Sequence, residues 1–382
     1  MNDVGHTAIC ARTIADAAAA AGIKPTIYCP ANYDGNLYEY MDKTLPPLDS
    51  KELFIIHWLK AIVSLTNIFR LEKNKNLYLL YTSGLMGAFV IFFSKLLSGT
   101  KSKIVIVSHV GLKDVYPDSN GIIGQTKRFI ARYVFIEPYF YMLAHMKNIY
   151  FASNCDTLIE MNARTFGMKN TFVLPIPHSL NVPLHSNHIP SRILYIGDSV
   201  RLEKGLIYLP ELIMLAQKKM QHLIFINQIS FSGTLKNAKI IQAKDELTKI
   251  ARKHKKNVKF IVKNLGRDEY IQAIDDCDVV LLPYRRSFYQ TSVSGVFSEA
   301  VSAGKWCIVP SRTWMSRQKV KYSQVSEFES YDAESMLNAI MRCRNIHVDE
   351  NTTSMQIKAW RKEHSPENFI RVLLEKTGFE SI

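Results

Sequence analysis

One stretch in the second half of the chain, Val279–Pro310, constrains the fold most strongly. Its sequence is VVLLPYRRSFYQTSVSGVFSEAVSAGKWCIVP. The apolar run at its start, closed by a proline, is typical of a buried parallel strand. A polar, basic loop follows, then a helix with apolar residues at helical spacing that ends at Gly304, and then a second apolar run. A strand, a helix and a strand in this order predict a parallel α/β sheet.

The start of this predicted helix has the features of an anion site. The first backbone N–H groups of a helix, here around Ser294, Gly295 and Val296, have no partner inside the helix, and small residues let a ligand approach them. Glu299 lies one turn further on, where a carboxylate cannot serve a phosphate but can accept hydrogen bonds from hydroxyl groups such as those of a ribose. The alternative is an ordinary packed helix with Glu299 in solvent.

The segment SGVFSEAVSAGKWCIVP resembles the donor-site motif of GT-B-fold glycosyltransferases, in the large retaining family with a paired-glutamate motif (glycosyl transferases group 1). In that family two glutamates are separated by seven residues. Glu299 matches the second, which pairs with the ribose of the nucleotide sugar. Thr291 stands at the place of the first, which lies near the sugar ring. This difference bears on sugar recognition and on activity.

A second motif follows the predicted strand Arg192–Ile196 and reads GDSVRLEKG. Members of the same family carry an arginine and an E-K-G element in this loop, and Arg201 and Lys204 match them. A guanidinium, an ammonium and a helix N-terminus can stabilise the charge that develops on a departing nucleotide diphosphate without a metal. The spacing of three residues lets both side chains face one site. The loop lacks the phosphate-binding pattern G-x-x-x-x-G-K-[ST], and a solvated basic turn is the alternative.

The first half alternates predicted strands and helices more weakly. A glycine-bearing turn at Gly5 leads directly into a helix, whereas such a turn normally follows a strand, so we expect a first strand to be missing. Gly5 matches the glycine loop that faces the donor phosphates in the family; a plain turn glycine is the alternative. His109 follows the predicted strand Lys103–Val107, at the strand end where ligands bind. The resemblance implies a catalytic contact of His109 with the sugar, and a structural histidine is the alternative.

These patterns predict an α/β protein of GT-B architecture, with two doubly wound Rossmann-like domains facing a cleft. We expect an N-terminal acceptor-binding domain at residues 1–180 and a C-terminal nucleotide-sugar-binding domain at residues 190–360. The connection between them contains four prolines, from Pro175 to Pro190. Residues 361–382 are expected to form a helix that crosses back to the first domain, and Thr313–Met315 is expected to form a loop.

The net charge limits the classes of binding partner, and the spacing of the cysteines indicates the state of the thiols. The 382 residues include 48 lysines and arginines against 34 acidic residues, a net charge of +14 that suits a phosphate-bearing substrate, an anionic membrane or nucleic acid. No nucleic-acid-binding motif is present, so we expect no nucleic-acid partner. Six scattered cysteines without a C-x-x-C predict reduced thiols and neither a disulfide framework nor a zinc site. No secretory signal is visible.

Two basic stretches have alternative interpretations. Thr126–Tyr150 mixes basic and aromatic residues, which suit a lipid interface, stacking on nucleic-acid bases, or a long helix covering the sheet, interrupted at Pro138. The run Lys249–Lys256 is expected to be a solvated helix face. The apolar stretch Leu77–Leu97 is too interrupted for a membrane span. We expect a cytoplasmic protein, with the inner face of a bacterial plasma membrane as a candidate peripheral site.

The function that the resemblance implies is transfer of a sugar from a nucleotide sugar to a hydroxyl of a glycan or lipid-linked acceptor, as a hexosyltransferase (EC 2.4) of polysaccharide or glycolipid biosynthesis. Retention of configuration and independence of metal are expected, with no cofactor besides the donor. Lys204, Arg201 and His109 are the expected catalytic residues. The alternatives are a nucleotide-sugar 2-epimerase, a phosphorylase, whose pyridoxal lysine we cannot locate, and a degenerate, non-catalytic nucleotide-binding protein.

Overall fold

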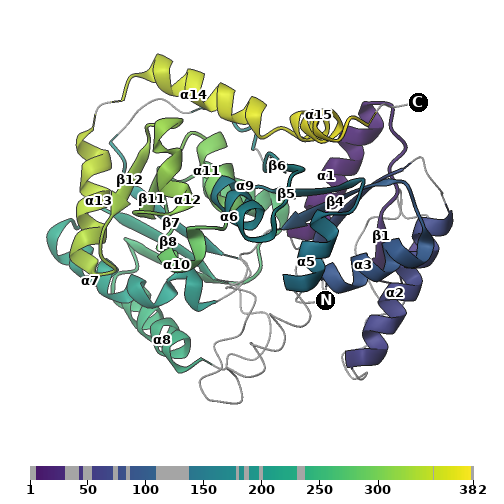
Figure 1. The fold of residues 1–382 in the computed structure, drawn as a ribbon. Helices are drawn as coiled ribbons and strands as arrows, with labels where there is room; N and C mark the ends of the chain where they lie inside the picture. The colour runs from purple at the N-terminus through teal and green to yellow at the C-terminus, as the bar shows by residue number, and fades with distance from the viewer. Residues whose placement is uncertain are drawn as a thin grey trace. The chain divides into compact units, whose positions relative to one another are not determined.

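The structure is a computed structural model in which the chain divides into two compact units (Figure 1). Unit 1 comprises Met1–Pro177 and Pro366–Ile382, and unit 2 comprises His178–Ser365. The structure describes residues 6–30, 43–45, 54–71, 76–82, 87–108, 137–177, 180–184, 189–197, 201–229, 237–346 and 348–379. Gly5 and His109 lie outside these ranges.

Unit 1 is built on a four-stranded parallel sheet of order β3-β4-β5-β6, with a separate parallel pair, β1 and β2. The strands are β1 (Tyr28–Pro30), β2 (Lys43–Leu45), β3 (Leu77–Thr82), β4 (Lys103–Ser108), β5 (Ile149–Ser153) and β6 (Thr171–Val173). The helices are α1 (His6–Ala20), α2 (Phe54–Leu71), α3 (Gly87–Ser98), α5 (Glu137–Ala144), α6 (Asp156–Phe166) and α15 (Pro366–Thr377).

The alternating side chains of β4 show how the two faces of this sheet are covered. Ile104 and Ile106 pack in one core with residues of α2, α3 and α5. Val105 and Val107 point to the opposite face and pack with residues of α1 and α15. Both faces of a parallel sheet must be covered, and α15 therefore contributes to the core of unit 1 although it is the last helix of the chain.

Unit 2 contains a six-stranded parallel sheet of order β12-β11-β10-β7-β8-β9. Its strands are β7 (Arg192–Gly197), β8 (Ile224–Ile229), β9 (Val258–Val262), β10 (Val279–Leu281), β11 (Trp306–Pro310) and β12 (Val325–Phe328). Its α-helices are α7 (Leu209–Lys219), α8 (Ala238–Lys253), α9 (Arg267–Asp275), α10 (Arg286–Tyr289), α11 (Gly295–Ser302), α12 (Trp314–Arg317), α13 (Ala333–Asn345) and α14 (Glu350–Glu363). Short 3₁₀ turns are formed by Leu202–Lys204, Leu206–Tyr208 and Gln318–Val320.

The two faces of the unit 2 sheet are covered by different helices. Residues of α7, α8 and α13 form one core with alternate residues of β7, β8 and β10. Outside this core, Phe297 of α11 packs edge-on against Trp314 of α12 and Trp360 of α14. The ring centroids are 5.7 and 6.0 Å apart. Trp360 also donates a hydrogen bond from Nε1 to Ser298 Oγ at 3.2 Å. This packing holds α11 in a fixed position at the sheet.

Most strands that the sequence predicts are confirmed, and the differences concern short or polar helices. The loop expected at Thr313–Met315 is wrong: Thr313 caps α12, and Trp314 and Met315 are buried. The basic loop after β10 contains α10, and α14 was not predicted at all. A helix of four residues has too few positions to show a period, and α14 buries only Thr353, Ile357 and Trp360.

The structure describes residues 137–150 of the stretch Thr126–Tyr150. In this part the helix α5 ends at Ala144, and Pro138 lies in its first turn, where a proline is tolerated. The ring of Tyr139 packs against Phe89 at 4.9 Å between centroids, and Phe140 is buried. These aromatic side chains serve the core of unit 1. Within the described residues, no helix combines the length and apolar character needed to cross a bilayer.

Candidate functional site

The strand order of unit 2 indicates where a ligand can bind. From β7 the chain passes to β8 and β9 on one side, and then returns to β10, β11 and β12 on the other. The order therefore reverses between β7 and β10, which pair directly, Val279 opposite Ile193. Ligands of such sheets bind beyond the carboxyl ends of the strands at this reversal. Both sequence motifs follow these two strands.

The loop after β7 is packed onto the loop after β10. Gly205 has a φ of +75°, and a Cβ atom there would lie 1.9 Å from the carbonyl oxygen of Pro283. The N–H of Arg285 donates to the carbonyl of Glu203 at 2.8 Å. Only glycine allows both the left-handed conformation and this close approach. The glycine of the E-K-G element therefore joins the two motifs into one structure.

Lys204 lies at this junction and is 8% exposed. Its Nζ atom is 4.1 Å from the centre of the Tyr284 ring and 5.5 Å from that of Tyr289. An ammonium over an aromatic ring is attracted by the negative electrostatic potential of the ring face. Its backbone carbonyl accepts a hydrogen bond from the hydroxyl of Tyr195 at 3.3 Å. The side chain is thus held at the carboxyl end of the sheet by packing.

Arg201 has a different environment although it lies only three residues away. It precedes the 3₁₀ turn Leu202–Lys204, and 52% of its side chain is exposed. Its Nε atom lies 3.1 Å from Oε1 of Glu203. The structure brings Lys204, but not Arg201, against Tyr284. The preceding residues of the same loop, 198–200, lie outside the described ranges.

The predicted helix start is α11, with Ser294 as its N-cap. The Ser294 hydroxyl accepts a hydrogen bond from the N–H of Phe297 at 3.2 Å. By the geometry of a helix, the N–H groups of Gly295 and Val296 have no acceptor inside α11. Ser292 is buried, and its hydroxyl has no hydrogen-bond partner among the described residues. Thr291 is half-buried at the start of this segment. The N–H groups of Gly295 and Val296 and the hydroxyl of Ser292 therefore lie close together in sequence at the start of α11, without an acceptor or donor inside this helix.

Glu299 lies in the second turn of α11, and its side chain is 1% exposed. Its Oε1 atom accepts a hydrogen bond from Nη1 of Arg267 at 3.0 Å, and Oε2 accepts one from the hydroxyl of Tyr270 at 2.5 Å. A carboxylate offers about four lone-pair positions, so one remains on each oxygen. Glu299 is therefore not the solvated carboxylate of the alternative interpretation.

The partners of Glu299, Arg267 and Tyr270, were not predicted as site residues. They are the first and fourth residues of α9, and the spacing of three places them on one helix face. Burial, followed by the charge of Glu299, raises the pKa of the Tyr270 phenol well above its ordinary value, so Tyr270 remains a donor. Their spacing was visible in the sequence, but nothing there pointed to Glu299, which lies about thirty residues further on.

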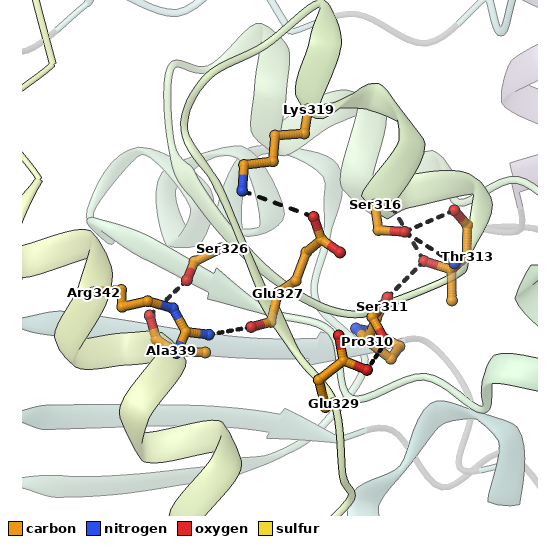
Figure 2. A network of polar contacts seen from close by, with 10 residues as sticks. All are labelled: Pro310, Ser311, Thr313, Ser316, Lys319, Ser326, Glu327, Glu329, Ala339 and Arg342. Carbon is orange, nitrogen blue, oxygen red and sulfur yellow. Dashed lines mark hydrogen bonds and ion pairs between the residues drawn. The ribbon is translucent and has the colours of Figure 1, made fainter.

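Arg286, in the basic loop after β10, has a structural role. Its guanidinium donates to the carbonyl of Ser311 at 2.7 Å, to Ser311 Oγ at 2.9 Å and to the carbonyl of Glu329 at 2.6 Å. Figure 2 shows Ser311 Oγ in turn bonded to the Glu329 carboxylate, at 2.8 Å, beside the Thr313 cap of α12. These bonds tie the loop after β10 to the ends of β11 and β12.

Asp278, directly before β10, has a structural role. Its Oδ2 atom accepts hydrogen bonds from the N–H groups of Ser191 and Arg192, each at 2.8 Å, and so fixes the start of β7. Within the described ranges, no group of three His, Cys, Asp or Glu side chains is arranged to hold a metal ion.

Comparison with known proteins gives matches at the level of structure. No family model matches the sequence, and no curated protein matches it. A glycosyltransferase from Rickettsia africae has a TM-score of 0.66 at 13% identity, covering 98% of this chain and 94% of that one. The sucrose-phosphate synthase of Thermosynechococcus elongatus has a TM-score of 0.62 at 14% identity, covering 97% and 92%.

A third similar structure is the UDP-forming α,α-trehalose-phosphate synthase of Burkholderia xenovorans in complex with glucose-6-phosphate. Its TM-score is 0.59 at 11% identity, covering 84% of this chain and 77% of that one. At such identities the similarity establishes the architecture. The predicted fold is confirmed: this chain has the GT-B fold of these glycosyltransferases.

Proposed function

We propose that the protein is a glycosyltransferase that moves a sugar from a nucleotide sugar to a hydroxyl acceptor. The observation that carries this proposal is the convergence of Lys204, the start of α11 and the clamped Glu299 at the strand reversal of unit 2. A cation, free N–H groups and a fixed carboxylate match the phosphates and the ribose of one nucleotide. The similar structures named above, all of sugar-transferring proteins, support the same activity class.

Glu299 is proposed to bind the ribose. Arg267 and Tyr270 each occupy one acceptor position of its carboxylate, and the two positions left suit two vicinal hydroxyls. The carboxylate is oriented before the ligand arrives, so little side-chain entropy is lost on binding. The UDP-forming synthase of the same fold makes a uridine nucleotide the first candidate donor.

The start of α11 and Lys204 are proposed to bind the diphosphate, with Arg201 joining from the exposed side of the loop. As the glycosidic bond breaks, negative charge grows on the leaving diphosphate. The ammonium and the N–H groups of Gly295 and Val296 stabilise that charge because they are already in place. The buried hydroxyl of Ser292, unpartnered among the described residues, adds a further donor beside them.

The remaining predicted site residues keep their proposed roles. Thr291 is proposed to face the sugar, at the place where the resemblance implies a glutamate. Gly5 is proposed to lie at the donor phosphates and His109 at the sugar.

Retention of configuration is part of the proposal, with the leaving phosphate assisting attack by the acceptor hydroxyl. Glycosyl transfer with retention is described for a trehalose-6-phosphate synthase of the same fold. Metal independence is proposed because protein groups supply the positive charge. The acceptor is proposed to be a glycan or a lipid-linked sugar at the inner face of a bacterial plasma membrane, in polysaccharide or glycolipid synthesis, and the net charge of +14 supports an anionic surface.

A second candidate is a degenerate nucleotide-binding protein without catalysis. Thr291 favours it, because a hydroxyl cannot replace the charge of the glutamate that the resemblance implies there. Epimerisation of the donor is a third outcome. It would appear as isomerised nucleotide sugar without any acceptor.

A thermal-shift screen with UDP, GDP, ADP and CMP tests the nucleotide site. A ligand that binds only the folded protein raises the melting temperature by mass action. We expect one nucleotide to do so, and the shift to disappear in Glu299→Gln. Ser326→Ala is the matched control, since it removes a buried hydroxyl that donates to the Ala339 carbonyl at 2.8 Å, away from this site. An equal shift in Glu299→Gln would refute the assignment of Glu299. A bound nucleotide without transfer would favour the degenerate protein.

A further inference from the structure

Unit 2 carries a cluster of cations that the proposed transfer does not use. Between Glu246 and Asp268 the sequence has eight lysines and arginines and no acidic residue. Two of them are ion-paired, Lys263 with Glu269 and Arg267 with Glu299. The other six are exposed and form no ion pair with the described carboxylates. Lys259 points to the other face of the sheet, because its neighbours Val258 and Phe260 pack in the core that α8 covers. We call the remaining five cations the basic ridge: Lys249, Arg252, Lys253, Lys255 and Lys256.

The basic ridge lies at the opposite end of the sheet from the candidate nucleotide site. It covers the last turns of α8, which is labelled in Figure 1, and the turn that follows this helix. Because all strands of this sheet are parallel, this is the amino end of the strands. Lys204 and Glu299 belong to the carboxyl end. The ridge therefore cannot contact the phosphates of a nucleotide bound there.

Local structure explains only part of this charge. Arg252 and Lys253 lie in the last turn of α8, where cations favour the negative end of the helix dipole. Lys259 on the edge strand discourages pairing with another chain. Lys255 and Lys256 lie in the turn and serve neither purpose. A surface groove beside Lys253 also contains Glu211, Asp332 and Glu334. Glu334 is ion-paired with Lys219, Asp332 caps α13, and Glu211 lies in the first turn of α7, near the positive end of that helix dipole.

We propose that the basic ridge docks the protein on an anionic lipid bilayer. Clusters of four to eight lysines and arginines on a helix bind anionic headgroups, and each contributes about fivefold to the binding constant. Four of the five ridge cations are lysines, whose hydrated point charges suit a fluid array of headgroups more than one fixed ligand. Phe260, the one Phe, Tyr or Trp between Glu246 and Asp268, packs against the core. It therefore offers no platform for stacking unpaired nucleic-acid bases.

This proposal is independent of the proposed transfer. It uses different residues, at the other end of the sheet, and would hold for a protein without catalytic activity. Loss of nucleotide binding in Glu299→Gln leaves it unaffected. In the same way, a failure of vesicle binding would not bear on the nucleotide site.

The test is co-sedimentation of the full chain with vesicles of phosphatidylcholine alone and of equimolar phosphatidylcholine and phosphatidylglycerol. We expect binding to the anionic vesicles, weakening as salt is added. The variant Lys255→Gln/Lys256→Gln should bind them about 25-fold more weakly, since two contributions of about fivefold are lost. The matched control Lys358→Gln/Lys362→Gln removes the same charge from exposed positions of α14 and should change binding by no more than about twofold, as expected for cations outside the docking surface.

Several results would overturn the proposal. One is equal binding to both kinds of vesicle, and another is no binding to either. An equal loss in the α14 control would show that net charge, and not the ridge, attracts the surface. Tighter binding of a DNA duplex that requires Lys255 and Lys256 would assign the ridge to nucleic acid. An unchanged melting temperature in both variants ensures that folding does not account for the difference.

Discussion

The two ends of the unit 2 sheet carry positive charge in different ways. At the carboxyl end, Lys204 is held on the Tyr284 ring, Arg267 is paired with Glu299, and Arg286 is bonded to Ser311. At the amino end, the five cations of the basic ridge are exposed to solvent without ion pairs to the described carboxylates. The first group is fixed by folding, and the second keeps its conformational freedom.

Fixed and mobile cations recognise different ligands. A fixed cation has lost its side-chain entropy on folding, so it can stabilise an anion in one defined position at little further cost. A mobile lysine loses that entropy on binding, but it adapts to many positions and works in numbers. The carboxyl end therefore suits one small anionic ligand, and the amino end suits an extended anionic surface. Four predictions test this contrast, in order of decreasing effect.

Lys204→Met removes the ammonium but keeps most of the aliphatic stem. We expect kcat to fall by about 10²–10³-fold, the loss typical of one donor that stabilises developing charge. The measurement is release of nucleoside diphosphate from the nucleotide sugar that the thermal-shift screen identifies. Lys305→Met is the matched control, because Lys305 is similarly buried but bonded to the Asp275 carbonyl at 2.7 Å, before β11. Similar rates in Lys204→Met and wild type would exclude Lys204 from catalysis.

Gly205→Ala tests whether the two motifs depend on one close approach. The added Cβ would lie 1.9 Å from Pro283 O, in a left-handed conformation that costs about 1–2 kcal/mol by itself. We expect a larger loss of unfolding free energy than that, measured by urea denaturation of the full chain. Gly99→Ala has a similar φ of +63° with no atom within 4 Å of the new Cβ. Equal losses in the two variants would show that the contact with Pro283 has no energetic importance.

Tyr270→Phe removes one of the two protein donors to Glu299. A hydrogen bond to a charged group is worth about 1.5–3 kcal/mol, and we expect about a tenfold rise in KM for the donor because the carboxylate is no longer fixed. The value of kcat should change little. Tyr322→Phe is the control, since its buried hydroxyl donates to Lys305 O at 3.0 Å near the amino end. A KM equal to that of wild type would contradict a positioning role for Tyr270.

Lys255→Gln/Lys256→Gln should leave turnover of a soluble donor within about twofold of wild type, since exposed substitutions typically change free energies by less than about 0.5 kcal/mol. The same release assay, without vesicles, measures this. A large fall in kcat would mean that the basic ridge contributes to chemistry, and the contrast between the two ends of the sheet would be lost.

Much of unit 2 follows from local sequence patterns. The strand predicted at Arg192–Ile196 is β7 (Arg192–Gly197), and α11 begins at Gly295, where the sequence predicts a helix start. Short helices were missed because four residues show no period, and α10 and α12 are both of this length. In the first half of the chain, the residues predicted at the phosphates and the sugar, Gly5 and His109, lie outside the described residues and remain predictions.

The candidate site was predictable in part. The resemblance pointed to Glu299 and Lys204, and the structure buries both, Lys204 in the loop after β7 and Glu299 in α11 after β10. It did not point to Arg267 and Tyr270, since nothing in a sequence window links α9 to α11. The resemblance also gave Arg201 and Lys204 the same role as cations at the diphosphate. In the structure Arg201 is exposed and paired with Glu203, whereas Lys204 is buried.

Local sequence was sufficient for the order of most strands and of the longer helices other than α14, for the turn at Gly304 and for the motifs of the candidate site. These depend on periodicity and on backbone conformation, which act over a few residues. Which groups meet is a property of the folded chain: Glu299 meets Arg267 and Tyr270, 32 and 29 residues away, and Gly205 meets Pro283. Such contacts depend on the order of strands in the sheet, because that order brings distant segments together and buries them in one place.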